Sequence, residues 1–129
     1  MSAPALALLL ALAQAPVPPP PEAASAAGQP ATLQLAGATD VTIAHLTLTG
    51  GQYGVYAANS SGSHRYTISS NEITGNASGG IYIGQSVTDG VIRENVVHDN
   101  GNSIDIYLYL TSRTLVEGNH VYNSSTGIY

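Results

Sequence analysis

The chain of 129 residues contains no cysteine, tryptophan, phenylalanine or lysine. Without cysteine it has neither a disulfide framework nor thiol chemistry, although this does not fix its compartment. Three arginines and a net charge of −5 cannot neutralise many phosphates, so nucleic acid is not an expected partner. No apolar run reaches the roughly 20 residues that a membrane-spanning helix needs, so no membrane span is expected.

What the chain does contain is a repeat in which one asparagine stands between aliphatic residues. Asn71, Asn95 and Asn119 occupy this position and are spaced by 24 residues (95 − 71 and 119 − 95). An earlier copy has Leu46 in the same place. A fixed period in this range predicts a stacked repeat in which each unit contacts the next.

Each repeat holds three short segments of alternating apolar and polar residues, separated by two loops and one tight corner. Such short strands cannot bury their apolar faces alone. Coiling lets each strand pair with its copy one coil later, about 4.8 Å away. We therefore predict an all-β solenoid over residues 32–129, with parallel sheets on three faces and about three to four coils of roughly 24 residues.

Three columns of aliphatic residues are expected to stack into a continuous core. They are Ile43, Ile68, Ile92 and Val116; Leu48, Ile73, Val97 and Val121; and Leu33, Val55, Ile81, Ile106 and Ile128. The asparagines are expected at the tight corner, where this residue type tolerates a left-handed backbone. Their amides carry donors and acceptors, so Asn71, Asn95 and Asn119 are predicted to bond along the axis as a ladder.

Alternating charges form a further column, made of Asp40, Arg65, Asp89 and Arg113. Neighbouring coils would set aspartate beside arginine, and Arg93 and Glu117 would form a similar pair. Exposed ion pairs add little stability, so these residues are predicted to fix the register of the coils.

The tyrosine column is the candidate binding surface, and consists of Tyr56, Tyr82, Tyr107 and Tyr129. Each follows the inward residue of the third strand, so the four rings would form an outward stripe. One reading is a ladder that stabilises adjacent strands. The other is a platform on which sugar rings lie while the phenols bond sugar hydroxyls.

Residues 1–31 differ in composition from the rest. A short Ala/Leu run and a Pro-rich stretch resemble a secretory signal and linker, which implies a secreted or periplasmic location. No Lys or Arg precedes the run, and the alternative is a short helix that caps the stack.

Metal and catalytic signals are weak. The four histidines share no column and no HExxH spacing occurs, so no metal site is predicted. Asp99 and Asp105 flank one turn and could bind Ca²⁺ through oxygen atoms, although aspartate is also a common turn residue.

The unit V-x-I-x-x-N-x-I-x-x-N followed by G-I-Y-I resembles the right-handed parallel β-helix of the pectin-lyase-like superfamily over residues 32–129. The resemblance implies a right-handed solenoid. It also implies that the asparagine ladder lies at the corner between the second and third strands, and that the sheet bearing Tyr56, Tyr82 and Tyr107 matches the face lining the polysaccharide groove. Since helices of this family run for more coils, it implies a fragment of a longer helix, or an open C-terminal end covered by self-association.

The sequence departs from the enzymes of that superfamily. Its loops before the tyrosine face are short, lysine is absent, and Asp105 is the one aspartate expected on that face, whereas glycoside hydrolysis needs two carboxylates. We therefore expect a carbohydrate-associated module that binds polysaccharide, or processes it within a longer parent. The alternatives are a structural or adhesive repeat segment, and a fragment of a polysaccharide lyase or hydrolase.

Overall fold

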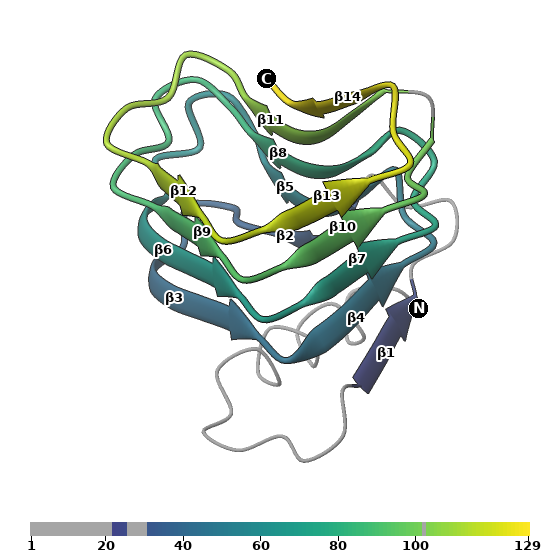
Figure 1. Ribbon diagram of the computed structural model, residues 1–129. Coiled ribbons are helices and arrows are strands. Elements are labelled where there is room, and N and C mark those ends of the chain that lie inside the picture. The colour runs from purple at the N-terminus through teal and green to yellow at the C-terminus, as the bar shows by residue number, and fades with distance from the viewer. Residues whose placement is uncertain (1–21, 26–30, 102) are drawn as a thin grey trace.

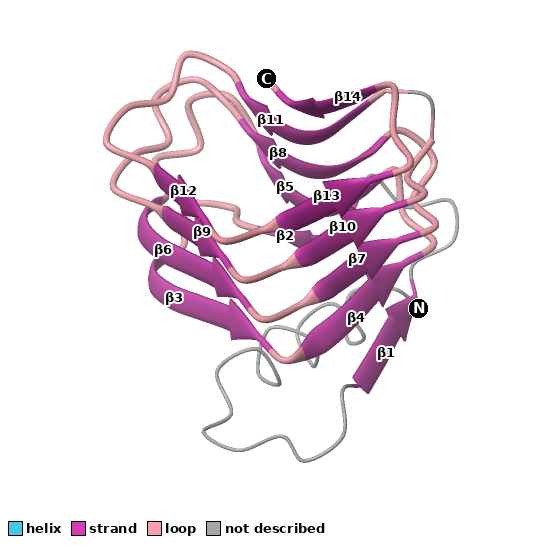
Figure 2. Cartoon of the chain, in the orientation of Figure 1, coloured by secondary structure: helices cyan, strands magenta, loops and turns pink. Residues whose placement is uncertain are grey.

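The computed structural model describes residues 22–25, 31–101 and 103–129, which form an all-strand solenoid (Figure 1). The chain winds about four times through three parallel sheets, and equivalent residues lie about 24 positions apart. Loops join the strands at the corners (Figure 2). The predicted fold class is therefore confirmed.

Each coil contributes one strand to each sheet in the order C, A, B. Sheet C contains β3 (Thr39–Ala44), β6 (His64–Ser69), β9 (Val91–Arg93) and β12 (Leu115–Glu117). Sheet A contains β1 (Glu22–Ser25), β4 (Leu46–Thr49), β7 (Glu72–Thr74), β10 (Val96–His98) and β13 (His120–Tyr122). Sheet B contains β2 (Ala31–Gln34), β5 (Tyr53–Ala57), β8 (Gly79–Ile83), β11 (Ile104–Leu108) and β14 (Thr126–Ile128).

The register places like residues over one another. Ile43 pairs with Ile68 and Ile68 with Ile92 in sheet C, while Val55 pairs with Ile81 and Ile81 with Ile106 in sheet B. All six of these side chains are fully buried. The β-branched side chains pack along the axis, which is the usual composition of a parallel sheet.

Tyr66 is the largest fully buried side chain, and it packs in the core beside Gly90, which has no side chain. The ring of Tyr66 is buried and its hydroxyl lies 3.2 Å from the Thr114 hydroxyl, two coils away. Gly90 lies between them, and a Cβ at that position would meet the Tyr66 ring. Burial raises the pKa of the Tyr66 phenol, so it remains a neutral hydrogen-bonding group.

Residues 1–21 and 26–30, expected to hold the signal-like run and most of the linker, lie outside the described residues. Within the expected linker, β1 pairs in parallel with β4 and adds a strand to sheet A. Among the described residues, no helix is long and apolar enough to span a membrane.

Candidate functional site

The asparagine ladder lies at the short corner between sheets C and A. The Asn71 amide nitrogen donates to the Asn95 Oδ1 at 3.0 Å, and Asn95 donates likewise to Asn119 at 2.9 Å. Each amide also donates to a carbonyl of the preceding coil, such as that of Ile43 for Asn71. In the first coil, the Leu46 N–H donates to the Asn71 Oδ1. The predicted hydrogen-bonded stacking of these residues is confirmed.

The backbone at this corner differs from the prediction. The left-handed residues are not the asparagines but those just before them, His45, Ser70, Glu94 and Gly118, with φ from 55° to 64°. A left-handed residue turns the chain, and the next side chain then points into the coil. The expectation that asparagine itself takes the left-handed conformation was wrong, because its role is to satisfy buried polar groups.

A second ladder, which the sequence reasoning missed, lies at the corner between sheets A and B. Asn76 donates to the Asn100 Oδ1 at 2.8 Å, and both side chains are buried. The residues before them, Gly75 and Asp99, have positive φ. The signal was present, since 100 − 76 is again 24 and the repeat unit ends in a second asparagine.

The charge column forms two separate pairs. Arg65 binds Asp40 with two hydrogen bonds of 2.7 and 2.9 Å, and Arg113 binds Asp89 in the same way. The Arg65 guanidinium lowers the pKa of Asp40. Among the described residues no ion pair joins Arg65 to Asp89, so the alternation is not a continuous ladder. The expected Arg93–Glu117 pair does not form either, although the two residues face each other in sheet C.

The structure brings the tyrosine column together on the outer face of sheet B. Tyr56 pairs with Tyr82 and Tyr82 with Tyr107, and the backbone of Tyr129 bonds β11 opposite Tyr107. Ring centroids are 5.0, 5.2 and 5.5 Å apart along the column. The four rings therefore form one contiguous stripe that spans four coils.

Two further tyrosines widen the stripe. Tyr53 lies 5.5 Å from both Tyr56 and Tyr82, and Tyr109 lies 6.1 Å from Tyr107. Tyr109 follows Tyr107 by two residues, so alternation along the chain places both on the same face. Tyr53 precedes Tyr56 by three residues, so strict alternation does not account for its position, which its ring contacts establish instead. Burial raises the pKa of the Tyr53 phenol and of the Tyr82 phenol.

The tyrosine rings differ in their orientation relative to their neighbours. Tyr56 and Tyr82 stack with an interplanar angle of 23°, so each covers one face of the other. Tyr107 is nearly perpendicular to both Tyr82 and Tyr129, at 82° and 89°. In each of these T-shaped pairs the edge of one ring meets the face of the other. Tyr109 and Tyr129, which are 37% and 71% exposed, are the most exposed rings of the stripe.

Asp105 does not lie on this surface, contrary to the expectation. Its side chain is fully buried, Oδ1 accepts from Asn100 at 3.0 Å, and Oδ2 has no hydrogen-bond partner among the residues that the structure describes. The register sets Asp105, within β11, opposite Gly80 and Gly127. Burial raises the pKa of its carboxyl.

Asp99, the other residue considered for Ca²⁺, is exposed at the corner that follows β10. It lies 2.6 Å from the Nδ1 of His98, whose Nε2 lies 3.2 Å from Glu72. The His98 ring also stacks on Tyr122 at 4.7 Å. Partial burial alone would lower the pKa of His98, but the hydrogen bonds of its ring to the carboxylates of Asp99 and Glu72 outweigh this and raise the pKa.

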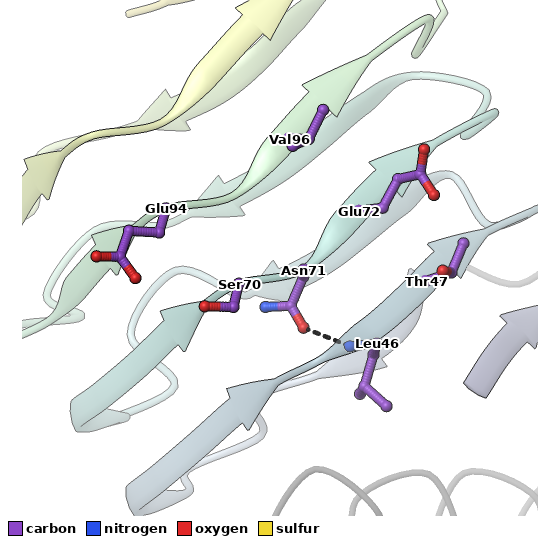
Figure 3. A pocket seen from close by; sticks show the side chains of 7 residues that line it. All are labelled: Leu46, Thr47, Ser70, Asn71, Glu72, Glu94 and Val96. Carbon is purple, nitrogen blue, oxygen red and sulfur yellow. Dashed lines mark hydrogen bonds between the residues drawn. The ribbon is translucent and has the colours of Figure 1, made fainter. Parts of the chain in front are cut away.

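A shallow depression of about 420 Å³ follows the ladder corner (Figure 3). Thr47, Ser70, Glu72, Glu94 and Val96 line it together with the ladder residues Leu46 and Asn71. The side-chain amide of Asn71 is already hydrogen-bonded within the fold, to Asn95, to the Ile43 carbonyl and to the Leu46 N–H. Among the described residues, no group of three or more His, Asp or Glu side chains is placed to hold a metal ion.

A family model described as a right-handed β-helix region matches residues 31–129. Comparison with curated proteins gave no match, and comparison with solved structures gave none either.

Proposed function

The chain belongs to the family of right-handed β-helix regions, and on that basis we propose that it binds polysaccharide along the tyrosine column of sheet B. The observation that supports this proposal is the contiguity of the rings, whose centroids recur at 5.0 to 5.5 Å over four coils. An extended ligand of repeating units matches such a surface better than a compact one does. If the chain is part of a longer protein, the same face would hold the polysaccharide that the parent processes.

Tyrosine suits this role because it combines an apolar ring with a polar tip. Sugar rings pack their C–H faces on aromatic faces, and their hydroxyls bond phenols. Tyr109 and Tyr129 expose the most ring surface for such contacts. The Tyr82 hydroxyl donates to the Asn59 Oδ1 at 3.3 Å, which orients it at the edge of the sheet.

A structural or adhesive repeat segment is the second candidate, since stacked tyrosines also stabilise adjacent strands by about 0.2–1 kcal/mol per pair. The outward exposure of Tyr109 and Tyr129 favours binding, because a purely structural ladder gains nothing from exposed rings. Catalysis has less support. Asp105 is inside the coil, and glycoside hydrolysis requires two carboxylates at the substrate.

The test is affinity electrophoresis of the full chain through gels that contain a panel of soluble polysaccharides. We expect at least one polysaccharide to retard the wild type, and we expect the Tyr82→Ala, Tyr107→Ala double variant to lose most of that retardation. Tyr122→Ala is the matched control, because Tyr122 is exposed on sheet A. Equal retardation of both variants, or none of the wild type, contradicts the proposal.

A secreted or periplasmic location is part of the same proposal, since a polysaccharide-binding face needs access to polymers outside the cytoplasm. Fusing residues 1–31 to a reporter and measuring its export tests this point directly.

A further inference from the structure

The strands of sheet B carry almost none of the charged residues of the repeats. Beyond residue 30, the strands of sheet B cover the ranges Ala31–Gln34, Tyr53–Ala57, Gly79–Ile83, Ile104–Leu108 and Thr126–Ile128. These ranges contain no Arg or His, and Asp105 is their one acidic residue. The other charged residues after residue 30, and all four histidines, lie on sheets C and A or at the corners that follow their strands, except for Asp89 and Arg113, which lie in the loops that lead from sheet B to sheet C.

Asp105 adds no charge to the outer surface of sheet B. The Asp105 side chain is fully buried and its Oδ1 bonds Asn100, so its carboxyl points into the coil rather than toward a ligand. The outer face of sheet B therefore presents aromatic rings, phenol hydroxyls and amides without a formal charge. The raised pKa of Tyr53 and Tyr82 keeps those two phenols protonated around neutral pH.

The arginines are not available to this face. Arg65 and Arg113 are each bound to an aspartate, and Arg93 lies on β9 of sheet C. A polyanionic chain on sheet B would consequently lose water from its carboxylates without gaining a cationic partner, which is unfavourable.

The acidic residues lie elsewhere on the molecule. Glu72, Glu94, Asp99 and Glu117 are exposed on sheets A and C and at the corners that end their strands. Together with the net charge of −5 they create a negative field that repels polyanions at low ionic strength.

We infer that the tyrosine column of sheet B selects uncharged polysaccharides and rejects polyuronates, a conclusion that rests on the proposed polysaccharide binding. The polar groups at its edge are amides and hydroxyls. The Asn59 Oδ1 accepts from the Gln85 N–H at 2.9 Å, and the Ser78 hydroxyl donates to the Gln52 Oε1 at 2.7 Å. Neutral donors and acceptors of this kind pair with sugar hydroxyls.

The test compares one polymer backbone in a charged and an uncharged form. Polygalacturonate and the neutral galactan made from it by carboxyl reduction are placed in affinity gels at low and physiological salt, with and without Ca²⁺, beside a panel of neutral glucans, xylans and mannans. We expect neutral polymers to bind at least about tenfold more tightly than polygalacturonate under every condition.

A charge-introducing pair of variants shows where the ligand lies. Gln85 is exposed beside the tyrosine column, and Thr42 is exposed on sheet C. We expect Gln85→Lys to gain retardation by polygalacturonate and Thr42→Lys to gain much less, although both change the net charge equally.

The outcomes separate the two proposals. Binding of polygalacturonate as tight as that of neutral polymers, in either Ca²⁺ condition, overturns the selectivity and leaves polysaccharide binding intact. Equal gains in the two lysine variants also overturn it. If no polymer binds the wild type, polysaccharide binding itself fails. A dimer in sedimentation that Tyr107→Ala dissociates, without any binding of polymer, identifies the face as a protein interface and overturns both.

Discussion

Asn95 uses every polar atom of its side chain inside the coil. Its Oδ1 accepts from the backbone and side-chain nitrogens of Asn71, and its Nδ2 donates to the Ile68 carbonyl and to Asn119. The residue is fully buried. Removing the amide would leave several buried groups without partners, and each such group costs about 1–3 kcal/mol.

Asn95→Ala is therefore expected to lower the free energy of unfolding by about 3 kcal/mol or more. Urea denaturation followed by circular dichroism measures the change. Thr42→Ala, on the exposed face of β3, serves as the control and should change stability little. A loss for Asn95→Ala no larger than that of the control would show that the ladder does not stabilise the fold.

Among the described residues, the Asp105 Oδ2 is the one buried side-chain polar atom without a hydrogen-bond partner. Burial raises the pKa of its carboxyl above the ordinary 3.8, so the folded state binds the proton more tightly than the unfolded state does. The stability linked to this proton is fully present below pH 3.8 and is lost as the pH rises through the raised pKa.

Asp105→Asn keeps the acceptor for Asn100 and removes the charge. We expect the variant to be more stable than the wild type at pH 7 by roughly 1 kcal/mol or more, with the difference shrinking toward pH 4. Thermal unfolding between pH 4 and pH 8 measures this dependence. A variant that is less stable than the wild type at pH 7 would mean that the ionised carboxylate has a partner that stabilises it.

At the scale of the strand, packing along the axis couples residues of different coils. The Tyr66 ring of β6 passes over Gly90 and reaches Thr114, so the three positions depend on one another. The glycine is required by this close approach, since any Cβ would enter the space of the ring.

Gly90→Ala is expected to destabilise the protein by about 1–3 kcal/mol, the usual cost of overpacking. In the Tyr66→Leu background, the same change should cost much less. A double-mutant cycle measured by urea denaturation gives the coupling between the two sites. Additive effects would show that the ring does not occupy the space above Gly90.

The strands of sheet B also show how an element sets the direction of its side chains. Alternation along β5 predicts that Val55 points inward and Tyr56 outward, and the structure places them so. Alternation is a local property, which is why the tyrosine column followed from the sequence. The relative rotation of the rings depends on contacts across coils and therefore did not.

At the scale of the whole molecule, stability is a sum over coils that contact only their neighbours. Core residues of the middle coils such as Ile68, Ile73 and Ile81 are fully buried, whereas Val116 and Val121 are half-buried and Ile128 is 51% exposed. The same kind of side chain thus stabilises the C-terminal coil less than it stabilises the middle ones.

Native-state hydrogen exchange of this chain should therefore be slowest for amides in β6–β8 and fastest for those in β12–β14. The reason is that the C-terminal coil can open without exposing the buried core of the coils below it. Uniform protection across all strands would contradict this view and would indicate a single cooperative unit.

The sequence by itself determined the period, the three aliphatic columns, the asparagine ladder and the outward tyrosines. Each of these depends on spacing along the chain and on the alternation of side chains, which are local. The tertiary structure decided that the residues before the asparagines turn the chain, that Asp105 points into the core, and that Tyr107 lies across its column. It also decided that one face of the solenoid carries no charge. These features arise from contacts between coils, because only the winding brings residues 24 positions apart to one strand spacing.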